Sequence, residues 1–230
     1  MTLHIGLLVF PSIQQLDLTG PYDVFASLPG VTVHLVWKTR GPIRASTGLI
    51  LQADMSYEDC PALDVICIPG GVGVDALLED RETLEFIRLQ ATSARFVTSV
   101  CTGALVLGAA GLLKGRRATT HWASHGLLKA LGAIPVHERV VRDGNLITGG
   151  GITAGIDFAL TLVSELLGPE QAQLVQLQLE YAPAPPFNSG HPSTAPTGIL
   201  ATAQERAAPG LAKRQEIVDR VVEGGYWRSI

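Results

Sequence analysis

The sequence predicts an α/β domain with a mainly parallel sheet and helices on both faces. Short, nearly continuous apolar runs alternate along the chain with longer amphipathic or alanine-rich segments. Such runs are typical of central parallel strands, and their alternation with helical segments is typical of parallel sheets covered by helices. The chain has 230 residues, of which 47% are hydrophobic and 17% charged, so it can bury a large core.

Each element follows from its local pattern. Apolar and β-branched runs predict central strands at residues 4–10, 31–39, 63–68 and 94–98, and a short strand at 117–120. Turn residues predict hairpins within residues 43–53 and 138–148, the second around Asp143-Gly144. Periodicity and capping residues predict helices at residues 21–26, 81–93, 103–113, 124–131, 153–167, 169–181 and 203–222, the last interrupted near Pro209-Gly210.

The composition changes near the carboxyl end of the predicted domain. Residues 182–190 are rich in proline, which favours an extended backbone. We therefore expect two regions, an α/β domain of residues 1–190 and an extension of residues 191–230 that contains a helix.

Charge and cysteine usage exclude several classes of protein. The net charge of −4 argues against an electrostatic surface for nucleic acid, and no apolar stretch reaches membrane-spanning length. The first residues lead into a strand-like run without the basic and long apolar regions of a signal peptide. Cys60, Cys67 and Cys101 are an odd count at unrelated spacings, which favours reduced thiols and a cytoplasmic protein.

Cys101 lies where a predicted strand ends and a predicted helix begins. A residue at such a corner projects outward, like the serine of a nucleophile elbow, and the helix N-terminus favours a thiolate. We expect Cys101 to be reactive; the alternative is a small buried hydrophobe. Cys67, inside a strand-like run, is expected to be inert core, and Cys60, in a loop before Pro61, to have no special role.

Asp17 is the first candidate partner of this cysteine. If Pro21 lies in the first turn of a helix, Asp17 lies in the loop after the first strand. In a doubly wound sheet this loop is at the carboxyl edge, where ligands bind. The alternative is an aspartate that stabilises a turn or caps the helix.

Glycine and histidine residues follow other predicted strands. Gly70 and Gly71 can approach a ligand closely, and their N–H groups could stabilise a developing anion, although such pairs also occur in plain turns. Residues 149–151 are three glycines at a predicted helix start, which allows close approach and hinge freedom. His121 is a candidate base, but its position beside Trp122 is also typical of packing.

These segments together resemble the ThiJ/PfpI family of the class I glutamine amidotransferase-like superfamily. The resemblance covers about residues 3–190 in the family's order and spacing. It rests on Val9-Phe10, Leu16-Asp17-Leu18-Thr19-Gly20-Pro21, Ile68-Pro69-Gly70-Gly71, Ser99-Val100-Cys101-Thr102-Gly103-Ala104, Ala118-Thr119-Thr120-His121-Trp122 and Thr148-Gly149-Gly150-Gly151. It implies a flavodoxin-like α/β fold.

Within the family, Asp17, Thr102 and the Pro-Pro-Phe of residues 185–187 resemble members that add water to an isonitrile. The resemblance implies a small-molecule isonitrile substrate, a homodimer packed close to the nucleophile, no metal or organic cofactor, and no nucleic acid or membrane partner. It also implies roles for particular residues. The implied catalytic residues are Cys101, Asp17 and Thr102, and the implied substrate-binding or charge-stabilising residues are Gly70, Gly71, Thr102, His121 and Gly150.

His121 is a secondary candidate, because in this branch of the family the matching histidine is often not positioned to complete a triad. Two other functions are compatible with the fold. Glyoxalase, deglycase or chaperone-like stress proteins of the family mostly carry Glu where this chain has Asp17. A redox or ligand sensor would need an oxidisable Cys101 but no turnover.

Overall fold

The computed structural model describes residues 2–225 and confirms the predicted fold class. A seven-stranded sheet has the order β10-β11-β7-β6-β1-β2-β5, and all its strand pairs are parallel except β10–β11. Its strands are β1 (Leu3–Leu8), β2 (Val31–Trp37), β5 (Met55–Ser56), β6 (Val65–Ile68), β7 (Phe96–Val100), β10 (Val140–Asp143) and β11 (Leu146–Gly149). Two small sheets contain β3 (Gly41–Arg44) with β4 (Ile50–Ala53) and β8 (Arg117–Ala118) with β9 (Ile134–Pro135).

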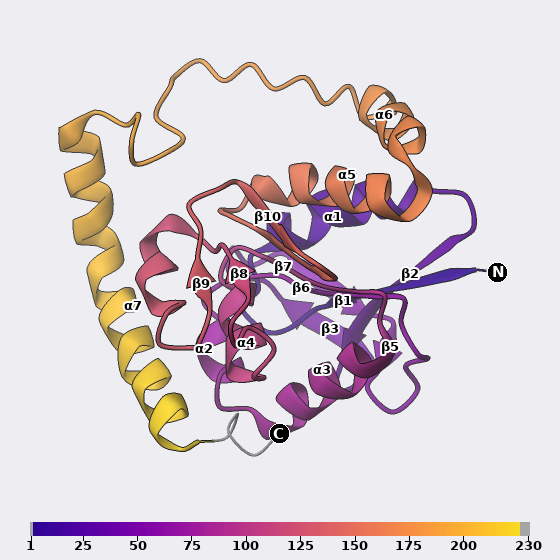
Figure 1. The fold of residues 1–230 in the computed structure, drawn as a ribbon, viewed down its shortest axis with the longest axis horizontal. Helices are drawn as coiled ribbons and strands as arrows, with labels where there is room; N and C mark the ends of the chain where they lie inside the picture. Colours follow the sequence, from indigo (N-terminus) through magenta and orange to yellow (C-terminus); the bar gives the residue numbers. More distant parts are fainter. Residues whose placement is uncertain (1, 226–230) are drawn as a thin grey trace.

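Helices cover both faces of the large sheet (Figure 1). One face carries α1 (Gln15–Ala26) and α5 (Ala154–Leu167), with α6 (Pro169–Gln178) outside α5. The opposite face carries the short α2 (Val74–Leu77), α3 (Arg81–Ser93) and α4 (Gly103–Ala109). The last helix, α7 (Thr197–Glu223), packs against α4 and the 3₁₀ turn η1 (Trp122–Leu127).

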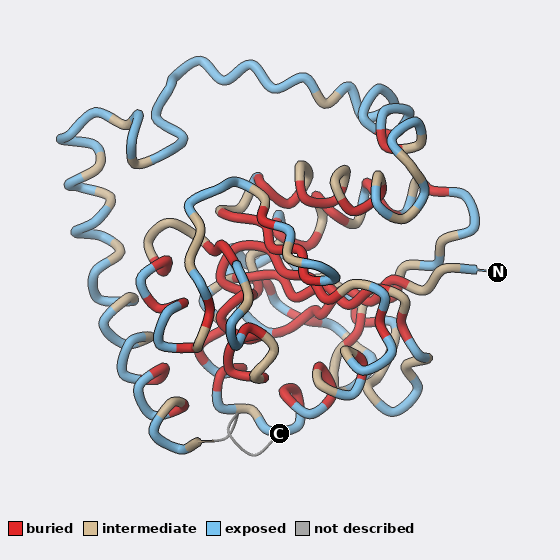
Figure 2. The backbone as a smooth tube through the Cα atoms, in the orientation of Figure 1, coloured by how far each residue is buried: buried red, intermediate tan, exposed pale blue. Residues whose placement is uncertain are grey.

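The central strands form the core, which appears as the red tube in Figure 2. All four residues of β6 are buried, as are the last four residues of β1. Covering on both faces explains why these strands are continuously apolar in sequence instead of alternating. The carboxyl ends of β1, β6, β7 and β11 meet at one edge, so the segments that follow them lie close together.

The start of α1 differs from the prediction. The helix begins at Gln15, so Asp17 lies in its first turn rather than in a loop, and Pro21 is interior. Asp17 N–H donates to the Gln14 carbonyl at 3.0 Å, and Ile13 pairs with Gly71. These contacts fix the helix start upstream of Pro21, and tertiary pairing therefore overrides the preference of proline for a first turn.

Three other helix predictions are corrected. Helix α4 ends at Ala109 rather than Leu113, because the chain turns at Gly111, whose φ is 82°. The segment predicted as a helix at 124–131 is the 3₁₀ turn η1, which begins at Trp122. Helix α7 starts at Thr197 and runs through Pro209 without a break; Pro209 is exposed, so water can satisfy the carbonyl that it leaves without a partner.

Residues 182–190 contain no regular secondary structure, as predicted, and lie in an arm that arches away from the body to α7 (Figure 1). The arm is largely exposed (Figure 2). Helix α7 returns to the body, where Ile217, Val218 and Val221 are buried in the common core. Within residues 2–225, no helix is long and apolar enough to cross a membrane.

Candidate active site

Cys101 occupies the predicted corner between β7 and α4. Its φ is 55°, a strained conformation for a residue with a side chain. Cys101 N–H donates to the Gly149 and Gly150 carbonyls at 3.0 and 2.8 Å, and its carbonyl accepts from Thr120 Oγ1 at 2.7 Å. These bonds hold the strained backbone, and they come from the strand and loop that neighbour β7.

Asp17 lies beside this cysteine and is fully buried. Gly70 N–H donates to Asp17 Oδ2 at 2.9 Å. Oδ1 is buried without a hydrogen-bond partner of regular geometry among residues 2–225, although the carboxyl and the thiol influence each other's pKa. Burial raises the pKa of Asp17 to about 7, against the opposing effects of the Gly70 N–H and the Cys101 thiol.

The expectation of a thiolate at Cys101 is wrong for the resting site. Burial raises the pKa of the Cys101 thiol, and the charge of Asp17 raises it further. The Thr102 N–H at the start of α4 lowers this pKa, but by less than burial raises it. With only 5% of the residue exposed, desolvation of the anion outweighs the helix N-terminus. The thiol therefore keeps its proton near neutral pH, whereas Asp17, with a pKa of about 7, is partly ionised there.

Gly70 and Gly71 pack tightly against this pair. A Cβ on Gly70 would lie 2.6 Å from Thr102 N and 2.8 Å from Asp17 Oδ2, so this position requires glycine. Gly71 N–H donates to Thr102 Oγ1 at 3.1 Å. In the resting site one of these N–H groups binds Asp17 and the other binds Thr102, and their role toward a developing anion stays a prediction.

The side chain of Thr102, the residue before α4, makes no hydrogen bond that caps this helix. Its hydroxyl instead joins α4 to the loop after β6, and its N–H interacts with the Cys101 sulfur. Thr102 thus connects the two segments that carry the nucleophile and the Asp17-binding N–H.

His121 lies at the edge of the site. Its Nδ1 accepts from Ala123 N–H at 3.3 Å, and its ring lies 5.5 Å from that of Trp122, between centroids. Burial lowers its pKa, and the positive charge of Arg214 lowers it further. Among residues 2–225, the hydrogen bonds of His121 reach neither Cys101 nor Asp17, so the structure does not bring this histidine into the pair.

His121 lines a cavity of about 450 Å³ beside the backbone of Cys101. Thr120 and Gly150, which bind that backbone, also line it. The full lining is Thr119, Thr120, His121, Trp122, His125, His137, Glu138, Arg139, Gly150, Gly151, Ile152, Thr153, Gly190 and His191. Within the described part of the chain, no three His, Cys, Asp or Glu side chains are arranged to hold a metal ion.

The three glycines before α5 show the predicted close approach, since a Cβ on Gly149 would lie 3.1 Å from Phe158 Cβ and one on Gly151 would lie 3.3 Å from His121 Cδ2. None of them has a positive φ, so they do not use the backbone freedom of glycine. Gly150 N–H donates to the Arg139 carbonyl at 2.8 Å, and Arg139 also binds Thr153 and Asp157 at the start of α5. The segment is fixed by these bonds rather than hinged, and Gly150 contributes a carbonyl to the elbow.

The remaining cysteines behave as expected. Cys67 is fully buried in β6, and burial raises its pKa to about 12. Cys60 is partly buried, and its pKa is about 11 for the same reason. Neither residue shares the strained corner of Cys101.

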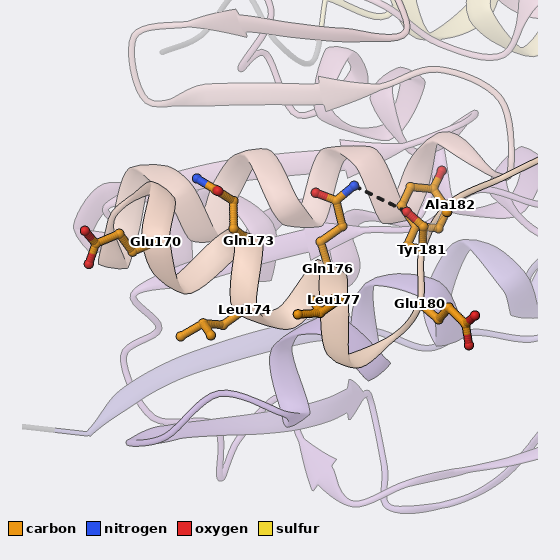
Figure 3. Close-up of a pocket in the computed structure, with 8 residues that line it drawn as sticks. All are labelled: Glu170, Gln173, Leu174, Gln176, Leu177, Glu180, Tyr181 and Ala182. Carbon is orange, nitrogen blue, oxygen red and sulfur yellow. Dashed lines mark hydrogen bonds between the residues drawn. The ribbon is translucent and has the colours of Figure 1, made fainter.

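A larger groove of about 690 Å³ lies on α6, away from the predicted site residues. Figure 3 shows the side chains along it, with Gln176 bonded to the Tyr181 carbonyl. Its lining is Glu170, Gln173, Leu174, Gln176, Leu177, Glu180, Tyr181 and Ala182. The groove contains no candidate nucleophile, so size alone does not identify the active site.

Two residues that contribute to the site, Thr120 and Arg214, were not predicted from the sequence. Thr120 binds the Cys101 carbonyl, and its place next to His121 in a recognised motif was an available signal. Arg214 lies in α7, and its side chain is only 13% exposed beside Asp75. No local pattern distinguishes Arg214 from the other arginines of an amphipathic helix, so only the tertiary structure could identify it.

Comparisons with known proteins agree with this geometry. The DJ-1/PfpI family matches residues 4–165. The isonitrile hydratase of Pseudomonas putida is 69% identical over 220 residues, which cover 96% of each chain. A Parkinson disease protein 7 homolog from Danio rerio is 33% identical over 172 residues, covering 72% of this chain and 90% of the relative. The crystal structure of a ThiJ/PfpI family protein from Pseudomonas syringae has a TM-score of 0.92 and 42% identity, covering 95% of this chain and 91% of that one.

Proposed function

The chain belongs to the DJ-1/PfpI family, and we propose that it adds water to an isonitrile to give an N-substituted formamide. The observation that carries this proposal is the buried pair of Cys101 and Asp17, which holds a nucleophile and a transferable proton together. The 69% identity to an isonitrile hydratase supports the same reaction.

The first half-reaction uses that proton. The terminal carbon of an isonitrile, R–N≡C, must gain both a nucleophile and a hydrogen. The thiol proton passes through Asp17 to the carbon lone pair, the sulfur lone pair forms the C–S bond, and one π pair of the N≡C bond moves to nitrogen. The product is a thioimidate, R–N=CH–S–Cys101. Because S–H is added as a whole, no proton is drawn from solvent.

The second half-reaction consumes water. Asp17 accepts one proton from water as the water oxygen attacks the thioimidate carbon, and passes that proton to the imidate nitrogen. The C–S bond then breaks with its electron pair returning to sulfur, the carbon hydroxyl becomes the formyl C=O, and the hydroxyl proton returns through Asp17 to Cys101. The released product is R–NH–CHO, so the balance is one isonitrile plus one water.

The neighbouring groups have defined roles in this scheme. Gly70 N–H holds the Asp17 carboxyl in place at 2.9 Å, and Thr102 N–H interacts with the sulfur. Thr102 Oγ1 holds the Gly71 N–H and so fixes the loop after β6. We assign the cavity beside His121 and Gly150 to the substrate or to attacking water, because its wall binds the backbone of Cys101.

A trapping experiment tests this proposal. Rapid mixing with cyclohexyl isocyanide followed by mass spectrometry should show one adduct on the Cys101 peptide, and steady-state assay should show the formamide. Cys101→Ala should abolish both, whereas Cys67→Ala should retain the adduct. Formamide production by Cys101→Ala would contradict covalent catalysis, and no formamide from the intact protein would contradict the proposed activity.

The sensor alternative is less consistent with the site. A redox-sensing cysteine is typically an exposed thiol of low pKa. Cys101 is 5% exposed, and burial raises its pKa. The pair of Cys101 and Asp17 instead suits a reaction that adds both the sulfur and the thiol proton to the substrate.

We also propose that the chain forms a homodimer through an apolar surface at the edge of the site, here called the site-edge patch. Its members are exposed by 41% to 64%: Leu16, Leu49, Ile50 and Val72. Their segments are joined, since Thr47 Oγ1 donates to Gln15 Oε1 at 2.9 Å and Ile13 pairs with Gly71. Exposed apolar side chains gathered on joined segments favour a protein–protein interface.

A further inference from the structure

Arg214 of α7 joins two segments that are far from it in sequence. Its Nε donates to Asp75 Oδ1 at 2.6 Å, and its Nη1 donates to Ser124 Oγ at 3.1 Å. The side chains of Arg214 and Asp75 are 13% and 10% exposed, and Ser124 is 2% exposed. A charged pair so well removed from water is strongly held only when its geometry is good, as it is here.

The two partners of Arg214 lie in segments next to residues of the candidate site. Asp75 lies in α2, directly after the loop whose Gly70 N–H binds Asp17. Ser124 lies in η1, and its N–H donates to the His121 carbonyl at 2.9 Å. Figure 1 shows α7 running alongside the part of the fold that contains α2. Arg214 therefore connects the loop that holds the general acid–base to the turn that carries His121.

We propose that Arg214 is a positioning residue for the reaction, which clamps the loop of residues 69–75 against the turn of residues 121–124. This inference rests on the proposed function. The planar guanidinium presents its donors at fixed angles, so one side chain can hold the Asp75 carboxylate and the Ser124 hydroxyl in one arrangement. Lysine can keep the charge but lacks this fork.

Loosening the clamp has a specific expected consequence. The loop would then hold Gly70 N–H less firmly against Asp17 Oδ2, and this hydrogen bond lowers the pKa of Asp17. The pKa of Asp17 should therefore rise, and the lower limb of the pH profile should move to higher pH. Small misplacements of reacting groups also reduce the rate.

The same helix provides a matched control. Arg220 binds Glu79 with two hydrogen bonds of 2.9 Å, and this pair also joins α7 to the segment after α2. The side chains of Arg220 and Glu79 are 54% and 45% exposed, and the hydrogen bonds between them involve no residue of the segments 69–75 and 121–124. If Arg214 served only to dock α7, loss of the Arg220 pair would have a similar effect on activity.

The experiment compares Ser124→Ala, Arg214→Lys and Arg220→Gln in the full-length protein. We expect kcat/KM for cyclohexyl isocyanide to fall about tenfold in the first two, with the acid limb moved to higher pH, and to stay unchanged in Arg220→Gln. Ser124→Ala removes only one hydrogen bond and should keep the wild-type thermal midpoint. The double variant Ser124→Ala/Arg214→Lys should lose little more kcat/KM than either single variant, because both substitutions break the same bridge.

A second readout separates this inference from the proposed function. The rate of Cys101 alkylation by iodoacetamide, followed peptide by peptide against pH, requires no isonitrile turnover. The pH profile of the alkylation rate should shift in Ser124→Ala and Arg214→Lys whether or not the intact protein hydrates isonitriles. If the profile shifts but the intact protein produces no formamide, the proposed function is refuted and the positioning role of Arg214 stands. The positioning role would be overturned if Ser124→Ala and Arg214→Lys kept the wild-type kcat/KM and alkylation profile. It would also be overturned if Arg220→Gln changed kcat/KM and the alkylation profile as much as these two variants do.

Discussion

Asp17 and Cys101 show how burial decides chemistry at the level of single residues. Local sequence places the cysteine at a helix N-terminus, which alone would favour a thiolate. In the folded protein, desolvation raises the pKa values of both groups, and the pair keeps a proton near pH 7. The site is therefore suited to adding S–H rather than to attack by a free anion.

The pH dependence of activity follows from this pair. Asp17 must be ionised to accept the thiol proton, and its pKa is about 7. We expect kcat/KM to rise as pH increases through about 7, and Asp17→Asn to lose roughly 10²–10⁴ in rate, as is usual for a general acid–base group. Assays between pH 5 and 9 would check both. A flat profile through neutral pH, or near-wild-type turnover by Asp17→Asn, would contradict the assigned role.

Asp17 should also make stability depend on pH. Its pKa is near 3.8 in the unfolded chain and about 7 in the folded one, so the folded state binds more protons between these values. The contribution of Asp17 to stability is thus present below about pH 4 and is lost as pH rises through 7. At about 1.4 kcal/mol per pKa unit, Asp17→Asn should be more stable than wild type at pH 8 by at most about 4 kcal/mol.

Thermal melts of both proteins at pH 4 and pH 8 test this prediction. The advantage of Asp17→Asn should shrink as pH falls toward 4, because neutral Asp17 resembles asparagine. A lower midpoint for Asp17→Asn at pH 8 would show that the ionised carboxyl stabilises the fold.

At the level of elements, the elbow depends on close backbone packing. A Cβ on Gly103, the first residue of α4, would lie 1.9 Å from the Ile68 carbonyl oxygen. The strand-to-helix corner was readable from sequence because an apolar strand meets an alanine-rich helix at Cys101. The start of α1 was not, because it depends on the pairing of Ile13 with Gly71, which are distant in sequence.

Two alanine substitutions test this packing. Gly103→Ala should destabilise the protein strongly and reduce Cys101 reactivity, because α4 must shift away from β6. Gly210→Ala, in exposed α7 with open space around the new Cβ, should instead stabilise the helix by up to about 1 kcal/mol. Chemical denaturation of the two variants measures both effects. If Gly103→Ala were as stable as Gly210→Ala, the strand-to-helix corner at Cys101 would tolerate displacement of α4, and the prediction would be wrong.

For the whole molecule, the site-edge patch and the groove on α6 are alternative surfaces for a second copy. We expect light scattering at micromolar concentration to give about twice the chain mass of 24.3 kDa. Ile50→Glu should yield the single-chain mass, because a charge would be buried in the interface. Leu177→Glu, at a 78% exposed position on α6, should leave the dimer intact. Dissociation by Leu177→Glu alone would move the interface to α6.

The amino-acid sequence by itself determined the fold class, the positions of the central strands along the chain, the corner at Cys101 and the candidacy of Asp17, because apolar runs and turn residues act locally. Tertiary structure decided the protonation of Cys101 and Asp17, the partners of Gly70 and Gly71, and the position of His121. It also decided the bridge from Arg214 to Asp75, which are 139 positions apart. Desolvation and long-range hydrogen bonds arise only when distant segments meet, so no local pattern encodes them.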